Sequence, residues 1–213
     1  MTGEPRPLQD EATSADLVSS DVAFNGHVWD IRRDTFRLND DSLTREYMDH
    51  TGAVAILALD DQDRVLLINQ YRHPVRARLW EIPAGLLDID NEHPLDAAKR
   101  ELAEEADVEA ADWGVLAEFY TSPGSSDEAI RIYLARGVSA LPERFDREAE
   151  EADIEKRWVS LDEVTDAVRA RAVQNPSLVT GVLSAFVERQ RDWSGLGPAD
   201  ADWPRLRQRG SAE

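Results

Sequence analysis

The sequence contains no cysteine, which excludes a disulfide framework, a thiol nucleophile and a thiolate metal site. It has no apolar run near the roughly 20 residues that a membrane-spanning helix requires. The N-terminal segment, residues 1–17, is polar and acidic and does not resemble a signal peptide. From these absences we expect a soluble, cytoplasmic protein with no membrane partner.

Positive charge is also scarce. The chain has 24 basic and 43 acidic residues, a formal net charge of −19, and only Lys99 and Lys156 are lysines. Such a balance argues against a basic nucleic-acid-binding surface. The four histidines are scattered along the chain and do not suggest a histidine-based transition-metal site. A small molecule is therefore a better candidate partner than a nucleic acid.

The length of 213 residues suits one medium domain, or a domain with an extra lobe, and is enough to bury a sizeable core. The first 16 residues combine low hydrophobicity with two prolines and several charges, which is typical of disorder. We predict four segments: a disordered N-terminus (1–16), an N-terminal strand lobe (17–50), a main domain (51–190) and an irregular C-terminal tail (191–213).

The proposed strand lobe consists of three short extended segments, 18–24, 28–38 and 43–48. Asn25-Gly26 and Asn39-Asp40-Asp41 separate them and are typical turn residues. This pattern predicts antiparallel strands. Because isolated hairpins are marginally stable, we expect the lobe to pack on another surface, such as a second subunit.

The main domain mixes strands and helices. Ala53–Leu59 and Val65–Ile68 are apolar strands joined by a polar turn, and we predict that they form a hairpin in the main sheet. Helix Pro176–Gln190 begins with Asn175 as its cap. Strands between helices predict an α/β sandwich on a mixed sheet. The other expected elements are strands 79–82, 113–120, 129–135 and 156–159 and a helix at 161–170.

The clearest helix spans Pro94–Ala106, where Leu95, Ala98 and Leu102 recur at helical spacing. Its opposite side carries three carboxylates that are three or four residues apart. Two carboxylates about 4 Å apart repel each other by about 4 kcal/mol at an effective dielectric constant near 20. The cluster is therefore either a solvated face or the ligand set of a divalent cation. Its members are Glu101, Glu104 and Glu105.

The loop and helix together resemble the Nudix hydrolase signature, G-x5-E-x7-R-E-U-x-E-E-x-G-U, where U is apolar. There are two departures. Six residues rather than five separate Gly85 from Glu92, an insertion that a loop tolerates. Asp107 replaces the last glycine, and we expect it to adopt the left-handed conformation at a small cost in stability. The matching residues are Gly85, Glu92, Arg100, Glu101, Leu102, Glu104, Glu105 and Val108.

Further motifs are similar to the ADP-ribose pyrophosphatase branch of that family, over roughly residues 20 to 190. The resemblance implies a Nudix-type α/β/α sandwich that hydrolyses the diphosphate of ADP-ribose to AMP and ribose 5-phosphate. It also implies a homodimer formed through the N-terminal strand lobe. The motifs are Gln70-Tyr71-Arg72, Glu81-Ile82-Pro83-Ala84-Gly85, Ser122-Pro123-Gly124 with Asp127-Glu128, and Glu150-Glu151-Ala152-Asp153.

The resemblance implies a Mg²⁺ site, with Mn²⁺ as an alternative, built from Glu101, Glu104, Glu105 and the carbonyl of Ala84. Magnesium prefers such oxygen ligands, and it can polarise phosphoryl oxygens and activate water. Glu105 thereby also becomes a catalytic residue. Arg100 either orients the glutamates or simply pairs with Glu104 one turn away.

Other site residues follow from the same resemblance, and each has a plain structural alternative. Arg72 is expected to clamp phosphate but is otherwise a surface arginine. Arg45 is expected near the adenine across the dimer, or simply as part of the strand lobe. Glu128 contacts substrate or caps a turn. Glu150 is the expected general base, with Glu151 as the alternative, unless their loop is only a solvated one.

Two other functions remain open. The first is hydrolysis of a different nucleoside diphosphate derivative by the same machinery. The second is a non-catalytic Nudix-fold sensor that binds the nucleotide and regulates a partner. The retained arginine and glutamates of the helix argue against the sensor, since binding alone does not require a metal cluster.

Overall fold

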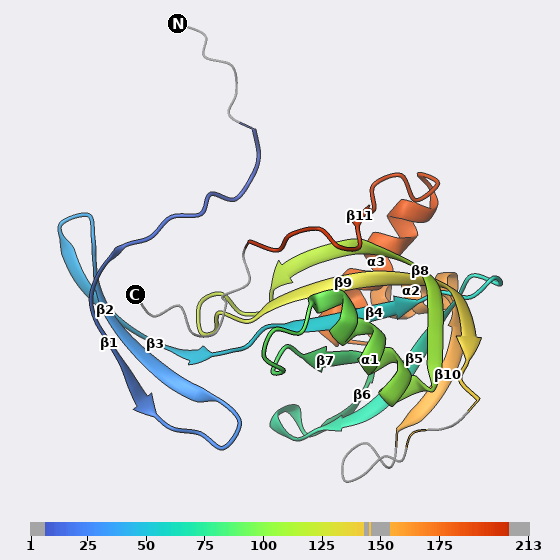
Figure 1. The fold of residues 1–213 in the computed structure, drawn as a ribbon, viewed down its shortest axis with the longest axis horizontal. Coiled ribbons are helices and arrows are strands. Elements are labelled where there is room, and N and C mark those ends of the chain that lie inside the picture. The colour runs from blue at the N-terminus through green and yellow to red at the C-terminus, as the bar shows by residue number, and fades with distance from the viewer. Residues whose placement is uncertain (1–6, 143–144, 146–153, 205–213) are drawn as a thin grey trace, which may run out of the picture. The chain divides into compact units, whose positions relative to one another are not determined.

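The computed structural model describes residues 7–142, 145 and 154–204. Glu150 and Glu151, the expected general base and its alternative, lie outside the described residues. The chain divides into two compact units, residues 1–49 and 50–213 (Figure 1).

The first unit is a three-stranded antiparallel sheet of β1 (Asp16–Phe24), β2 (Asp30–Leu38) and β3 (Asp41–Asp49), in that order. Cross-strand ion pairs join Arg32 to Asp49 and Arg33 to Glu46, at 3.0 and 2.9 Å. None of the residues in these three strands is buried. The predicted antiparallel strand lobe is confirmed, and it has no core of its own.

The second unit is built on a five-stranded sheet with the order β11-β8-β9-β4-β7. Strand β4 lies between β9 and β7, pairing in parallel with β9 and antiparallel with β7, so the sheet is mixed. All six residues of β4 are buried, as expected for a strand covered on both faces. The strands are β4 (Ala53–Ala58), β7 (Ala84–Leu86), β8 (Val108–Tyr120), β9 (Ala129–Ala140) and β11 (Gly197–Pro198).

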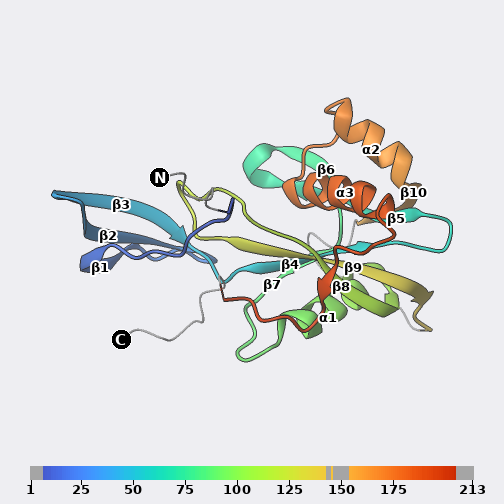
Figure 2. The same cartoon turned by 90° about the horizontal axis from the view of Figure 1, so that it is seen from above.

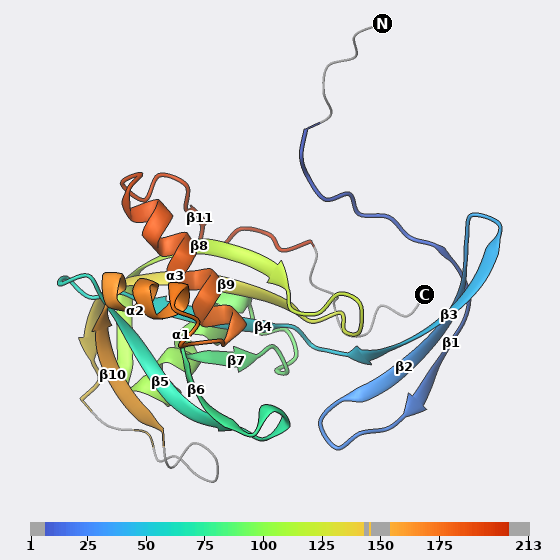
Figure 3. The ribbon, with the colours of Figure 1, turned by 180° about the vertical axis from the view of Figure 1, so that it is seen from behind.

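A smaller antiparallel sheet contains β10 (Glu155–Ser160), β5 (Arg64–Arg72) and β6 (Ala77–Glu81), with β5 in the middle. The short 3-10 helix η1 (His73–Val75) connects β5 to β6 (Figure 3). The predicted hairpin of the two apolar strands in one sheet is therefore wrong. β4 and β5 belong to different sheets and are joined by the isolated bridge between Leu59 and Val65. All of β4 pairs with β9, and its first three residues also pair with β7.

Helices cover both faces of the main sheet (Figure 2). α1 (Pro94–Ala106) packs on one face and α3 (Pro176–Arg189) on the other. α2 (Leu161–Arg169) lies on the same side as α3 and packs against α3, β5 and β10. Alternate residues of β4 divide between these layers: Ile56 joins the α1 core, and Leu57 joins the core with α2 and α3. The predicted α/β/α sandwich on a mixed sheet is confirmed. No helix within the described ranges has the length and apolarity needed to cross a membrane.

The ends of the helices follow local chemistry. The side chain of His93 accepts a hydrogen bond from the Leu95 N–H, and Pro94 occupies the first turn of α1. Asn175 caps α3 in the predicted way, accepting from the Leu178 N–H at 2.9 Å. Asp107 ends α1 with φ = 57°, which confirms the left-handed end expected at the position of the missing glycine.

The C-terminal tail is less irregular than predicted, because buried partners hold it. β11 pairs with β8, and the fully buried guanidinium of Arg131 donates to the carbonyls of Ala201 and Asp202 at 2.7 and 3.1 Å. The same guanidinium lies 4.8 Å from the ring centre of Trp203. Arg131 belongs to β9 and precedes Ala201 by 70 residues, so the composition of the tail did not indicate this contact.

Asp107 does more than end α1. Its buried carboxylate accepts hydrogen bonds from the Phe145 N–H, at 2.9 Å, and from the Lys156 ammonium of β10. The Lys156 ammonium also donates to the Ala106 carbonyl, at 3.1 Å. The aspartate thus joins the end of the helix to two later segments, which a glycine cannot do.

We predict that Asp107→Gly lowers the free energy of unfolding by about 1 to 2 kcal/mol. The relief of left-handed strain offsets only part of the loss of two hydrogen bonds, one of them to a charged group. The sequence alone suggested that aspartate at this position is slightly less favourable than glycine, so the expected destabilisation by glycine has the opposite sign. Urea denaturation of the wild type, Asp107→Gly and Asp107→Asn, which keeps an acceptor, tests it. A glycine variant as stable as the wild type would contradict the prediction, because the contacts would then contribute no more than the strain costs.

Candidate active site

Helix α1 packs against β7. A side-chain carbon added at Gly85 would fall 1.9 Å from the carboxyl carbon of Glu101, so the missing side chain at Gly85 makes room for that carboxylate. The neighbouring Ala84 N–H donates to the Glu105 carboxylate at 2.9 Å, and Glu105 is only 5% exposed. Two signature glutamates therefore lie against adjacent residues of one strand.

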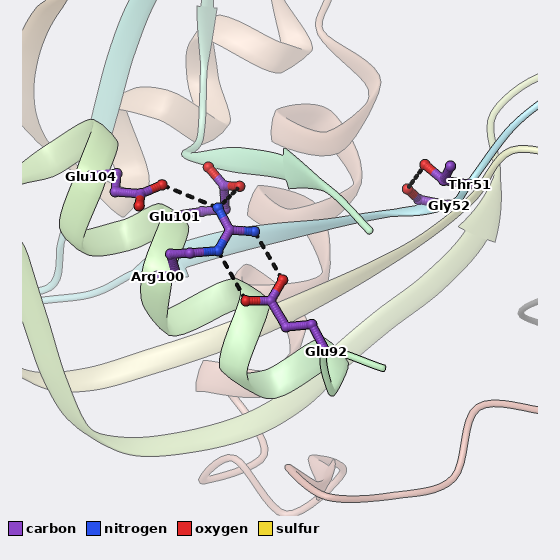
Figure 4. Close-up of polar contacts among 6 residues, drawn as sticks. All are labelled: Thr51, Gly52, Glu92, Arg100, Glu101 and Glu104. Atoms are coloured by element: carbon purple, nitrogen blue, oxygen red, sulfur yellow. Dashed lines mark hydrogen bonds and ion pairs between the residues drawn. The ribbon is translucent and has the colours of Figure 1, made fainter. Parts of the chain in front are cut away.

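Arg100 connects the remaining acidic residues of the signature (Figure 4). Its Nε and Nη2 donate to the two oxygens of Glu92, both at 2.9 Å. Its Nη1 donates to one oxygen of Glu101 at 2.6 Å and to one oxygen of Glu104 at 3.1 Å. Both interpretations of Arg100 from the sequence are therefore present: it pairs with Glu104 and it also fixes Glu101.

These contacts shift the ionisation of the cluster. Hydrogen bonds from Arg100 lower the pKa of the Glu92 carboxyl, and partial burial opposes this effect to a smaller extent. The pKa of Arg100 is raised, first by its hydrogen bonds to Glu92 and then by the nearby charge of Glu101. The loop residue Glu92 therefore stays ionised and holds Arg100 against the helix.

The donor set around β7 fits a hard divalent cation. Carboxylate and carbonyl oxygens are the ligands that Mg²⁺ prefers, and Gly85 leaves space for the Glu101 carboxylate beside the strand. Arg100 donates to one oxygen of Glu101 and to one oxygen of Glu104. Within residues 7–142, 145 and 154–204, no three acidic, histidine or cysteine side chains already converge as a metal cluster. The carboxylate and carbonyl oxygens near β7 therefore suit such a cation. Arg100 compensates part of the negative charge of these carboxylates in the structure.

Arg72 forms a bidentate pair with Glu81, with distances of 2.9 and 2.7 Å. Glu81 is 2% exposed, and this guanidinium is its ion-pair partner. Gln70, two residues earlier on β5, buries an Oε1 that has no hydrogen-bond partner among the described residues. The Gln-Tyr-Arg motif thus contributes a fixed cation and an unused buried acceptor. Glu81 in turn lies three residues before Ala84.

Glu128 lies in a second polar group. Its carboxylate is 3.2 Å from His50 Nε2 and accepts from the Thr121 hydroxyl at 2.5 Å. Glu128 immediately precedes β9. β4 lies between β9 and β7, and its first residue, Ala53, pairs with Leu86 of β7. Because neighbouring strands are about 4.8 Å apart, the backbone of Glu128 lies about 10 Å from β7.

Arg45 lies on β3 of the first unit, where its guanidinium donates to the Thr44 carbonyl at 2.8 Å. Arg45 therefore lies in the first unit, whereas the other described candidate residues lie in the second unit. No role was expected for the Glu81 or His50 side chain from the sequence. A glutamate in the apolar segment Leu79–Ile82 was an available signal for Glu81, whereas the sequence around His50 contains none, because its partner is 78 residues away.

Comparison with known proteins identifies the family. The family model described as NUDIX domain matches residues 49–178, which is more than half of the chain. The chain therefore belongs to the Nudix family. The expected resemblance and the expected class of enzyme, a Nudix hydrolase, are confirmed.

The curated relatives include ADP-ribose pyrophosphatases. The protein from Mycobacterium tuberculosis is 38% identical over 189 residues, covering 88% of this chain and 90% of the relative. That from Bacillus subtilis is 34% identical over 157 residues, covering 73% and 84%. A solved structure titled "Crystal structure of ADP compounds hydrolase" matches with a TM-score of 0.71 and 16% identity, covering 86% of this chain and 98% of that one. This last similarity concerns the fold.

We predict that the Glu92–Arg100 pair makes stability pH-dependent. The folded-state pKa of Glu92 lies below its ordinary value of 4.5, so the pair stabilises the fold above that pH. This stabilisation is lost as the pH falls through the folded-state pKa. The stability difference between wild type and Glu92→Gln should therefore shrink on acidification from about pH 7 to about pH 3, as measured by urea denaturation. A difference independent of pH would contradict the assigned pKa shift.

We also predict that Gly85→Ala displaces the Glu101 carboxylate and weakens divalent cation binding about tenfold or more. Because a flexible carboxylate can move away from the new methyl group, stability should change by less than about 1 kcal/mol. Mn²⁺ titration followed by electron paramagnetic resonance measures the affinity. Gly124→Ala is the matched control, since its added carbon meets no atom within 4 Å. Equal Mn²⁺ affinities for both variants would remove Glu101 from the metal site.

Proposed function

We propose that the protein is a Mg²⁺-dependent pyrophosphatase that hydrolyses ADP-ribose. Adding one water across the P–O–P link breaks one P–O bond and yields AMP and ribose 5-phosphate. The observation that carries the proposal is the position of Glu101 and Glu105 against β7. The ADP-ribose pyrophosphatases among the relatives support the choice of substrate.

In this proposal Glu101, Glu104 and Glu105 hold the cation, together with the carbonyl of Ala84. A bound Mg²⁺ supplies positive charge that polarises phosphoryl oxygens, and Mn²⁺ is the natural substitute. Arg100 orients Glu101 and Glu104 by its hydrogen bonds to both. Glu105 is held by the Ala84 N–H, so its carboxylate keeps one orientation relative to β7.

Three residues are assigned to the substrate. Arg72, which Glu81 holds by two hydrogen bonds, binds phosphate through its planar guanidinium. Arg45 of the first unit contacts the adenine of a substrate bound to the partner subunit. Glu128 accepts a hydrogen bond from a donor group of the substrate. The general base that takes the proton of water is Glu150, with Glu151 as the alternative, and both lie outside the described residues.

We further propose a homodimer formed through the first unit. Its three strands bury none of their residues, yet they expose large apolar side chains, including Leu17, Phe24 and Leu38. A sheet of this kind gains stability by packing against a second copy. The cytoplasmic location expected from the sequence stays a prediction, as do the segment boundaries at residues 16, 50 and 190.

The test is incubation of purified protein with ADP-ribose, with and without Mg²⁺, with AMP followed by chromatography. We expect AMP and ribose 5-phosphate only with the metal. A panel of another nucleotide sugar, a dinucleotide and a nucleoside triphosphate measures specificity through kcat/KM. Preference for a triphosphate would overturn the substrate. Tight ADP-ribose binding with Mg²⁺ and no turnover would instead establish the non-catalytic sensor.

We predict that Glu105→Gln lowers kcat by about 100-fold or more while the metal-free protein remains as stable as the wild type or becomes slightly more stable. The amide keeps an acceptor for the Ala84 N–H, while removing a buried negative charge reduces carboxylate repulsion. Turnover and urea denaturation without metal measure the two effects. Normal turnover with clear destabilisation would mean that Glu105 has only a structural role.

A further inference from the structure

His50, the first residue of the second unit, is enclosed beside the segment that leads into β9. Its side chain is 3% exposed, and its Nε2 lies 3.2 Å from Glu128 Oε1. Its backbone N–H also donates to the Asp127 carboxylate at 2.9 Å. Two consecutive acidic residues therefore hold one histidine, through its backbone and through its ring.

The ring of His50 has a defined tautomer. The Gly52 N–H donates to Nδ1 at 3.0 Å, so Nδ1 is an acceptor and carries no proton. The remaining proton of the neutral ring is then on Nε2, from which it is donated to Glu128. The backbone of Gly52 thus directs the histidine's only ring donor toward the carboxylate.

Thr121 holds the other oxygen of the same carboxylate. Its hydroxyl donates to Glu128 Oε2 at 2.5 Å, and its N–H donates to the Glu128 carbonyl at 3.2 Å. The backbone N–H of Glu128 is bonded to Ser126 Oγ at 3.1 Å. Glu128 is therefore fixed at its backbone and at both carboxylate oxygens, which leaves its side chain little rotational freedom.

The carboxylate nevertheless remains open to ligands. The Glu128 side chain is 20% exposed, whereas the His50 side chain behind it is almost completely buried. Each carboxylate oxygen has two acceptor positions, so one contact per oxygen still permits another. An ionised carboxylate only accepts hydrogen bonds and repels phosphate, so it is suited to a donor group of a substrate rather than to its diphosphate.

The same group is hydrogen-bonded to the end of β7, the strand against which Glu101 and Glu105 lie. The Gly52 carbonyl accepts from the Leu87 N–H at 3.0 Å, immediately after β7. Within β7, Gly85 makes room for Glu101. A short backbone path therefore joins the residue that directs His50 to the strand under the catalytic helix, which fixes the separation between Glu128 and the metal ligands.

We propose that His50 and Thr121 are positioning residues, which hold the Glu128 carboxylate in the orientation that accepts a hydrogen bond from the bound substrate. The proposal rests on the proposed hydrolysis of ADP-ribose. It gives a binding role to a buried histidine and to a threonine that neither contact the cation nor provide the base. Their loss affects substrate binding more than the chemical step.

Matched variants at Thr121 provide the first test. Thr121→Val removes the hydroxyl but retains the shape, whereas Thr121→Ser retains the hydroxyl. With Mg²⁺ present, Thr121→Val should raise KM for ADP-ribose about tenfold with kcat within about twofold of the wild type. Thr121→Ser should restore KM to within about threefold. Equal KM values for valine and serine, even with a lowered melting temperature, would overturn the positioning role.

His50 offers an independent pair of variants. Asparagine keeps an acceptor near the position of Nδ1 and loses the donor to Glu128, whereas glutamine places an amide donor near the position of Nε2. We expect His50→Asn to raise KM about tenfold and His50→Gln to raise it less than about threefold. If both variants change KM equally, the donor of His50 has no part in substrate binding and the proposal fails.

A spectroscopic measurement separates this proposal from the proposed function. In ¹⁵N-labelled protein without substrate, the His50 ring should show a protonated Nε2 and an unprotonated Nδ1. Glu128→Gln should shift the Nε2 resonance and leave the Nδ1 resonance nearly unchanged, because Gly52 still holds Nδ1. A proton on Nδ1 would overturn the arrangement. Because this result does not require turnover, a protein inactive on ADP-ribose would still reveal whether the pair exists.

Discussion

The close approach of α1 to β7 is the constraint on which the active site depends. Gly85 leaves room for the Glu101 carboxylate in its observed position, since an added side-chain carbon would overlap that carboxylate unless it moved. The apolar face of the helix includes Leu102, which is fully buried and packs in the same core cluster as Ile56 of β4. Truncating such a leucine typically costs about 2 to 5 kcal/mol, so ordinary apolar packing holds the acidic face against the strand.

Arginine compensates much of the crowded negative charge in this acidic protein. Arg100 spans three carboxylates because its planar guanidinium presents several donors in fixed directions, which a lysine ammonium does not. Arg72 pairs with the buried Glu81, and the buried Arg131 holds Glu118 and the tail. Removing one partner of such a pair would leave the other charge uncompensated, which is unfavourable. The two partners therefore stay together, and the segments that carry them are held in place.

The buried strand β4 relates the two polar groups of the site. On one side it pairs with β7, which lies under Glu101 and Glu105, and on the other with β9, which Glu128 precedes. The segment leading into β4 contributes His50 and Gly52, which act on Glu128 and on the end of β7. Both groups therefore lie toward the starting end of β4.

Local pattern alone determined the helices, the antiparallel lobe and the glutamate cluster, because helical spacing, capping residues and turn residues act within a few positions. It also located Asp107 as a left-handed helix end. Only the tertiary structure decided that β4 and β5 belong to different sheets, that Arg131 holds the tail, and that Asp107 binds Lys156. The same is true of His50 and Glu128, and of the space at Gly85. These contacts join residues that are far apart in the chain, and no spacing within one segment encodes which distant side chain the packed layers bring within hydrogen-bonding distance.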